Sequence, residues 1–311
     1  MDAKAIGQLG TDAEKQVKEQ NGDLEVDSVT GTDGKLYGVP YTDNTWFMYY
    51  NKSKITEDEA KDFDTILSKA KVAFSLQNSW YINGFYDGLS LFGEKGNDAD
   101  AGMVFPKDGA DITSYLVDVV ANPNFSNDDG ASGLAAIKDG SADVLFSGTW
   151  SAKDVKEALG DNYAATSLPT FTVNGQKKQM KSFAATKAAA YNPNAKNPKA
   201  AAQFAAYLGS TEAQKLHYEM RAIPPTDKSL SDLTTDDIAA KAQSDTMANT
   251  ALLQSGLSGM NDWWTPAETF GKALVNKEIT KDNAAAKYQD WSSRPVARSL
   301  SEISNSKKSN N

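Results

Sequence analysis

Four tryptophans lie in three short polar stretches, and these stretches give the clearest indication of chemistry in the chain. Trp80 lies in residues 78–81, Trp150 in 147–150, and Trp263 and Trp264 in 261–264. Core tryptophans normally have apolar neighbours, whereas these stand beside amide, hydroxyl and carboxylate side chains. An indole face can stack on the C–H face of a sugar ring while polar neighbours bind the hydroxyl groups around its rim. The pattern therefore predicts a carbohydrate-binding surface.

The sequence offers little for other kinds of site. It has no cysteine, which removes thiol catalysis, disulfides and cysteine metal sites. The one histidine, His217, lies in a helical run with Leu216 and Met220, and such a position favours a structural role. We therefore predict no catalytic residue, no metal site and no cofactor.

Size and charge narrow the function further. The chain has 311 residues, 40% of them hydrophobic and 23% charged, which is typical of a globular protein of two domains. Its formal net charge of −9 argues against nucleic-acid and anionic-membrane partners, since phosphate binding needs a basic patch. No apolar stretch approaches the roughly 20 residues of a membrane span.

Strand and helix patterns alternate along the chain, which predicts the α/β class. The strand at 143–146 leads into small residues, so backbone N–H groups should lie at the edge of the sheet where α/β folds bind ligands. Asp64 is the expected cap of a helix, and Phe204, Tyr207 and Leu208 are expected to face inward on another. Further strands are expected at 36–39, 46–50, 72–76 and 183–190, and helices at 2–20, 85–92, 131–139, 197–208 and 265–276.

Two blocks of sequence resemble a known family. Residues 33–40, followed by 49–52, resemble one block of the extracellular (family 1) solute-binding proteins of ABC importers, and 136–143 running into 147–150 resembles another. The paired helices of 197–220 are similar too. The nearest subfamily is that of the maltose/maltodextrin-binding proteins. The resemblance covers nearly the whole chain except its carboxyl-terminal tail.

The resemblance implies a two-lobe, periplasmic-binding-protein-like fold (type II) that closes on its ligand. Lobe I would comprise residues 1–43 plus 186–229, and lobe II residues 45–181 plus 230–298, with 299–311 a disordered tail. The family's opening strands and helices have no counterpart here, so we expect an amino-terminally truncated chain with lobe I incomplete. Such a lobe would expose sheet edges and apolar faces.

The resemblance also assigns the site. Trp80, Trp150 and Trp264 match aromatic stacking positions. Asn44 and Asn78 stand where maltose binders usually carry carboxylates, and Glu268 where they often carry arginine, which puts the same oligosaccharide preference in question. Gln77 is a second amide, Tyr81, Trp46, Asn261 and Asp262 are weaker candidates, and Trp263 could face the core instead. The predicted substrate-binding residues are Asn44, Gln77, Asn78, Trp80, Tyr81, Trp150, Trp264 and Glu268.

By the same resemblance, the protein would be the substrate-binding component of an ABC sugar importer. Its ligand would be a maltodextrin or related oligosaccharide, and its protein partners the ABC permease subunits. We expect a monomer at the cell surface, outside the membrane, lipid-anchored in the intact precursor of a Gram-positive bacterium. No signal peptide follows Met1.

Two other functions stay open. A glycoside hydrolase also lines its cleft with tryptophan, but it needs a carboxylic acid and a carboxylate across the scissile bond. Only Asp262 and Glu268 stand near the aromatic stretches, and no motif identifies such a pair. Alternatively, the chain is a truncated fragment that binds nothing.

Overall fold

The computed structural model describes residues 5–293. The helices are α1 Thr11–Gln20, α2 Asp23–Ser28, α3 Phe63–Lys69, α4 Gly109–Ala121, α5 Ser132–Asp139, α6 Ala152–Leu159, α7 Pro198–Leu208, α8 Thr211–Arg221, α9 Ile238–Asn249, α10 Asn261–Val275 and α11 Ala284–Ser292. The strands are β1 Val39–Thr45, β2 Phe47–Asn51, β3 Val72–Phe74, β4 Ser90–Leu91, β5 Met103–Val104, β6 Phe125–Asn127, β7 Val144–Ser147, β8 Tyr163–Thr166, β9 Thr170–Val173, β10 Gln176–Gln179, β11 Ser182–Ala189 and β12 Ala251–Leu253. Among these helices, none is long and apolar enough to cross a membrane.

A five-stranded sheet of order β6-β3-β7-β2-β8 organises the larger part of the molecule. β3 is parallel to β6 and β7, whereas β2 is antiparallel to β7 and β8. Side chains alternate along β2, so Met48 and Tyr50 enter the main apolar cluster while Phe47 and Tyr49 enter a second cluster on the other face. The expected central strand, buried on both faces, is confirmed.

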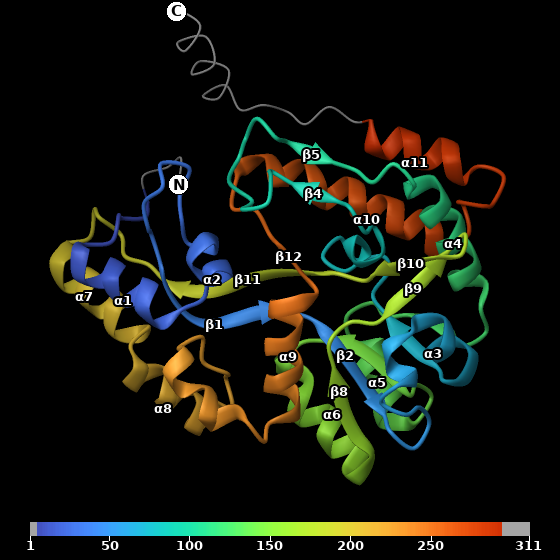
Figure 1. The fold of residues 1–311 in the computed structure, drawn as a ribbon, viewed down its shortest axis with the longest axis horizontal. Coiled ribbons are helices and arrows are strands. Elements are labelled where there is room, and N and C mark those ends of the chain that lie inside the picture. Colours follow the sequence, from blue (N-terminus) through green and yellow to red (C-terminus); the bar gives the residue numbers. More distant parts are fainter. Residues whose placement is uncertain (1–4, 294–311) are drawn as a thin grey trace, which may run out of the picture.

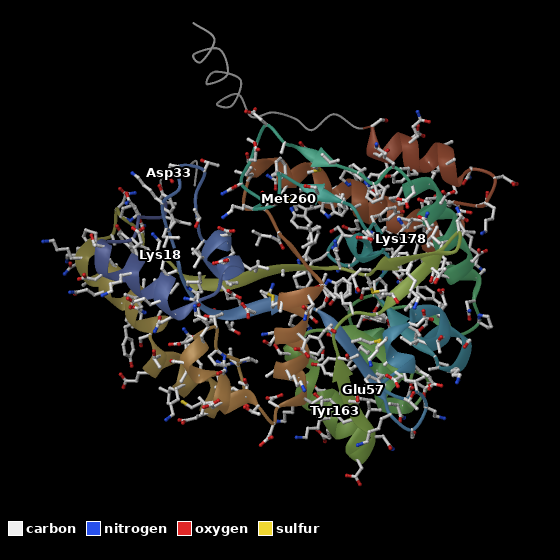
Figure 2. All side chains as sticks on the ribbon, viewed as in Figure 1. Lys18, Asp33, Glu57, Tyr163, Lys178 and Met260 are labelled. Carbon is white, nitrogen blue, oxygen red and sulfur yellow. The ribbon has the colours of Figure 1, made fainter. Side chains whose placement is uncertain are left out.

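The second main sheet joins two parts of the molecule. β1 pairs antiparallel with β11, and β11 pairs parallel with the short β12. The β1–β11 ribbon runs from the part with the five-stranded sheet to a smaller part that contains α1, α2, α7 and α8 (Figure 1). We call these parts the large lobe and the small lobe. In Figure 2, Lys18 and Asp33 lie in the small lobe, whereas Glu57, Tyr163, Lys178 and Met260 lie in the large one.

Several helix ends form as their local sequences predict. Asn197 caps α7 by accepting a hydrogen bond from the Ala200 N–H, with Pro198 in the first turn. Gly140 ends α5 with φ of 78°, a left-handed conformation that suits glycine. These ends depend only on residues close in sequence, which is why the sequence predicts them.

Three predicted helices are wrong in part. α1 begins at Thr11, because the preceding segment pairs with other chain segments: Gly7 N–H donates to Tyr191 C=O at 2.9 Å and Leu9 N–H to Leu36 C=O at 2.8 Å. Residues 2–4 of that prediction lie outside the described residues. No α-helix forms at 85–92: a 3-10 turn over Ile82–Phe85 ends there, Ser90–Leu91 form β4, and Phe92 has φ of 62°. The helix expected at 265–276 begins earlier, because 261–264 form the first turn of α10.

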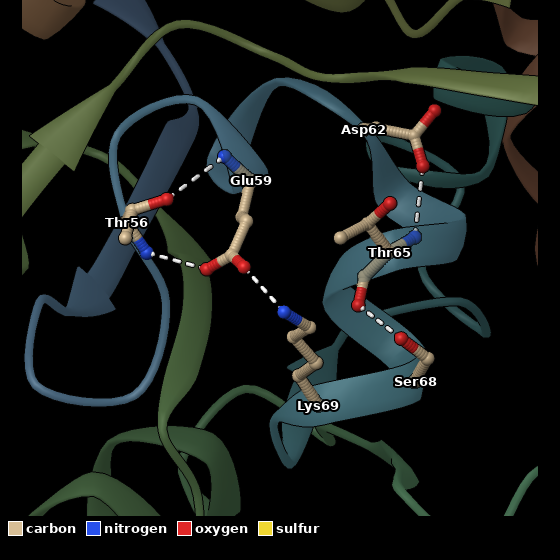
Figure 3. A network of polar contacts seen from close by, with 6 residues as sticks. All are labelled: Thr56, Glu59, Asp62, Thr65, Ser68 and Lys69. Carbon is tan, nitrogen blue, oxygen red and sulfur yellow. Dashed lines mark hydrogen bonds and ion pairs between the residues drawn. The ribbon is translucent and has the colours of Figure 1, made fainter.

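The predicted cap of α3 is also wrong. Asp62, not Asp64, caps this helix by accepting a hydrogen bond from the Thr65 N–H at 2.8 Å (Figure 3). Asp64 is inside the helix, and its carboxylate accepts hydrogen bonds from the Tyr115 hydroxyl at 2.7 Å and the Thr172 N–H at 2.9 Å. It therefore ties α3 to α4 and β9, a role set by distant residues.

The expected inward face of α7 is wrong for its two aromatic residues. Phe204 is 60% exposed and Tyr207 is 47% exposed, whereas Ala205 is buried. At the end of the helix Gly209 approaches β1 so closely that a Cβ there would meet Val39 Cγ1 at 2.3 Å. Small residues thus face the ribbon, and the aromatic side chains are turned outward.

Candidate functional site

Trp150 lies just beyond the carboxyl end of β7. Its indole is 52% exposed and lies against Gly148, where a Cβ would meet ring atom Cζ3 at 2.1 Å. The hydroxyls of Ser147 and Ser151, 2.8 Å apart, hydrogen-bond across the turn that carries it. All of β7 is buried, so a rigid strand presents an exposed aromatic face.

Trp80 lies beside Trp150. The two ring centroids are 6.1 Å apart, with an interplanar angle of 38°. Asn78 Oδ1 accepts a hydrogen bond from the Trp80 backbone N–H at 2.8 Å, which fixes the turn. The Trp80 indole N–H donates to Gln254 Oε1 at 2.9 Å. Two of the three predicted stacking residues, 70 positions apart in sequence, therefore form one aromatic surface.

The neighbouring tryptophans of α10 differ in their surroundings. Trp263 is 1% exposed, belongs to the core, and donates its indole N–H to Ser79 C=O at 2.9 Å. Trp264 is only partly buried, and its ring lies 6.0 Å from that of Phe183 on β11. Trp263 thus anchors α10 to the turn that carries Trp80, and Trp264 is the more accessible of the two.

The β1–β11 ribbon connects the aromatic groups. Phe183 contacts Trp264, and the adjacent Ala184 accepts a hydrogen bond from the Gln254 backbone N–H at 2.8 Å. Asn44 pairs with Ala185, and directly opposite residues of an antiparallel pair project to the same face. By alternation, Phe183 is on that face too. Asn44 and the Phe183–Trp264 contact therefore share one side of the ribbon.

The remaining predicted residues have other contacts. Gln77 is partly buried, and its backbone packs against α10, where a Cβ on Gly271 would meet Gln77 Cα at 2.9 Å. Glu268 forms an ion pair with Lys272 at 2.6 Å, one turn along the same helix. Neither side chain is shown to reach the aromatic surface.

The structure places Tyr81 and Trp46 in the core. Tyr81 is 8% exposed, stacks on Trp46 at 4.9 Å, and has its pKa raised by burial, with the Asp128 charge adding to the effect. Trp46 is wholly buried and donates its indole N–H to Trp80 C=O at 2.9 Å. Trp46 thus bonds the Trp80 backbone, and the Tyr81 ring contacts the Trp80 ring.

A cavity of about 790 Å³ lies on the other side of the ribbon. Asp43 and its partner Thr186 project to this side, opposite Asn44. Asp43 Oδ1 is buried without a hydrogen-bond partner among residues 5–293, and burial, followed by the nearby Glu25 charge, raises the pKa of Asp43 well above its ordinary value. Besides Asp43, the charged residues that line the cavity are Asp23, Glu25, Asp227 and Lys228.

Comparison with known families gives one match over most of the chain. The model of the family described as bacterial extracellular solute-binding protein matches residues 1–246. Trp80 and Trp150 lie within the matched residues, whereas Trp264 lies beyond them.

Two curated relatives are similar in sequence. The maltooligosaccharide ABC transporter solute-binding lipoprotein of Streptococcus pneumoniae R6 is 29% identical over 240 residues, which are 69% of this chain and 56% of the relative. The galactooligosaccharide-binding protein of Bacillus subtilis 168 is 27% identical over 290 residues, 83% of this chain and 66% of the relative. The chain thus spans little more than half the length of the first relative.

Solved structures share the fold. One recorded with acarbose is 42% identical, with a TM-score of 0.88 over 94% of this chain and 78% of that chain. The maltodextrin-binding protein MalE1 of L. casei BL23, without ligand, is 24% identical, with a TM-score of 0.81 over 94% and 79%. At that identity the second likeness concerns the fold alone.

Proposed function

Because the chain belongs to the bacterial extracellular solute-binding proteins, we propose that it binds a maltodextrin-type oligosaccharide as the substrate-binding component of an ABC sugar importer. The observation that carries this proposal is the aromatic surface of Trp80 and Trp150, with centroids 6.1 Å apart and Trp150 half exposed. The name of the pneumococcal relative and the acarbose recorded with the 42% identical structure support the ligand class.

In this proposal, sugar rings stack on Trp150 and Trp80, and Trp264 supplies a third indole. Asn44 donates to and accepts from hydroxyl groups, as an amide can. Gln77 and Glu268 would contact sugar rings that extend beyond the aromatic surface, Asn78 fixes the Trp80 turn, and Tyr81 packs against Trp80. Because the stacking residues are all in the large lobe, the small lobe would close over the sugar by rotation about the ribbon.

We propose the expected lobe division, 1–43 plus 186–229 and 45–181 plus 230–298, for the residues that the structure describes; residues 1–4 and 294–298 and the expected tail 299–311 lie outside them. The antiparallel pairing of Asp43 with Thr186 and of Thr45 with Ala184, on the two strands that join the lobes, supports it. An ABC permease would recognise the closed form, and the protein would act outside the cell, held at its surface. The lipoproteins among the named relatives support that location.

Calorimetry with maltotriose tests the proposal. Trp150→Ala should weaken binding about tenfold, equal to ~1.4 kcal/mol, because the exposed stacking face is lost. Phe204→Ala is a matched control, since it removes an exposed aromatic side chain in the small lobe. Equal affinity of wild type and Trp150→Ala would contradict the assignment.

A parallel titration separates ligand classes. The galactooligosaccharide-binding relative covers more of this chain than the maltooligosaccharide-binding one, 83% against 69%. A galactooligosaccharide that binds more tightly than maltotriose would replace the proposed ligand while keeping the site. Prolonged incubation with maltodextrins followed by product analysis should show no turnover, and steady product formation would favour the glycoside hydrolase instead.

A further inference from the structure

Gln254 is held in place on two sides. It follows β12, and its backbone N–H donates to Ala184 C=O on β11 at 2.8 Å. The next residue, Ser255, is 4% exposed, and its hydroxyl donates to Gly96 C=O. The backbone that carries the Gln254 side chain is therefore fixed to both the ribbon and the loop before β5.

The hydrogen bond to Trp80 decides which way the amide group of Gln254 is turned. Its Oε1 accepts the hydrogen bond from the Trp80 indole N–H at 2.9 Å. An indole nitrogen is a donor only, so turning the amide over would bring two donors together. The Nε2 group must then point to the other side of the amide, and among residues 5–293 no acceptor is shown for it. Gln254 is only partly buried, and its Nε2 group is open to an acceptor from solvent or from a ligand.

That unused donor lies at the aromatic surface. Trp80, its partner, is 6.1 Å from Trp150, and Ala184, its backbone partner, is next to Phe183, which contacts Trp264. Gln254 is thus bonded to Trp80, and its backbone partner on β11 is the chain neighbour of the residue that contacts Trp264. Sugar hydroxyl groups at the rim of a ring stacked on Trp80 are suitable acceptors for an amide N–H.

We propose that Gln254 is a ligand-binding and positioning residue of this site: its Oε1 fixes the plane of the Trp80 indole, and its Nε2 donates to a hydroxyl group of the sugar stacked there. This inference rests on the proposed function. It also links the stacking platform to the ribbon, since one residue bonds both Trp80 and β11.

Two variants separate the two roles. Gln254→Met removes both hydrogen bonds, whereas Gln254→Glu keeps an acceptor for Trp80 and removes the donor. The Trp80 indole N–H resonance in a ¹H–¹⁵N spectrum, assigned by its loss in Trp80→Phe, should shift in the methionine variant and stay near its wild-type position in the glutamate variant. Maltotriose affinity should fall about fivefold in both, as expected for one lost hydrogen bond.

Controls distinguish the possible failures. Gln203→Met, at an exposed position of α7, should leave both readouts unchanged. Wild-type affinity in Gln254→Glu would overturn the donor role, and an unmoved Trp80 resonance in Gln254→Met would overturn the positioning role. If Gln254→Met binds normally while Trp150→Ala does not, this inference fails and the proposed function stands. If neither variant affects binding, the proposed function itself fails.

Discussion

The two lobes bury very different amounts of apolar surface. In the large lobe both faces of the five-stranded sheet are covered, and rings such as Trp46, Phe74 and Phe146 are at most 1% exposed. The buried cluster of the small lobe is short: Leu9, Val17, Val29, Leu36 and Val39. Its helices also carry the exposed apolar side chains Phe204, Tyr207, Leu216 and Met220, the last 74% exposed.

This difference indicates which lobe can hold a binding site rigidly. A helix or sheet is stable only when its apolar face packs on another layer; α7 packs on the β1–β11 ribbon, whereas α8 packs mainly on α7 and on residues 228–234. Trp80, Trp150 and Trp264, the proposed stacking residues, are all in the large lobe, on elements anchored by a large core. The small lobe is suited to move, and its stability should depend on the ribbon.

The largest effect should come from the core of the large lobe. Phe74→Ala should lower the free energy of unfolding by about 3–5 kcal/mol, because it opens a cavity among fully buried aromatic rings. Urea unfolding followed by tryptophan fluorescence measures this loss. Val17→Ala, at a fully buried position of the small lobe, is the matched change.

Amide hydrogen exchange then tests the comparison itself. Val17→Ala should speed exchange in α1 and α8 while leaving β2 and β7 protected, because the small lobe opens separately. Equally faster amide exchange in both lobes would show that they unfold as one cooperative unit, and would contradict the contrast drawn between them.

An intermediate effect should come from Asp43, on the ribbon that joins the lobes. Its pKa is raised in the folded protein, so above pH 3.8 the folded state keeps a proton that the unfolded state has lost. Stability should therefore fall as the pH rises from 3.8 toward the folded pKa, by up to ~1.4 kcal/mol per pH unit. Asp43→Asn removes this dependence, so the variant should be more stable than wild type at pH 7 and equal to it near pH 3.

Thermal unfolding at several pH values measures the Asp43 effect. Asp23→Asn, at an exposed cavity residue, serves as control and should leave the pH profile unchanged. If the stability of Asp43→Asn depends on pH as that of the wild type does, the Asp43 carboxyl group ionises freely in the folded protein.

The smallest effect should come from the outer face of the small lobe. Phe204→Ser should change the free energy of unfolding by less than about 0.5 kcal/mol, since the ring is 60% exposed. Ala205→Leu, at its buried neighbour, should cost about 1–3 kcal/mol by overpacking against the ribbon. Thermal unfolding compares them, and a large loss in Phe204→Ser would show that this face is packed in solution.

Much of the local structure could be predicted. The helix ends at Asn197 and Gly140 and the two-faced burial of β2 follow from residue types and spacing. Predictions failed where a partner far along the chain decided: Asp64 bonds Tyr115 and Thr172 instead of capping α3, and residues 5–10 pair with Leu36 and Tyr191 instead of forming a helix.

The candidate site likewise has residues that the sequence identifies and one that it does not. Its aromatic residues could be found because tryptophan in a polar stretch is unusual wherever it occurs. Gln254 could not, because its sequence neighbours give no sign of chemistry and its partner Trp80 is 174 residues away.

The sequence by itself determined the α/β class, the family, the lack of cysteine chemistry and the three aromatic stretches, since each depends on composition or on neighbouring residues. Tertiary structure alone decided that Trp80 and Trp150 share a surface, that Trp263 enters the core while Trp264 does not, and that Phe204 faces outward. The physical reason is that burial and side-chain contact depend on which distant segments pack together, and local preference does not specify that packing.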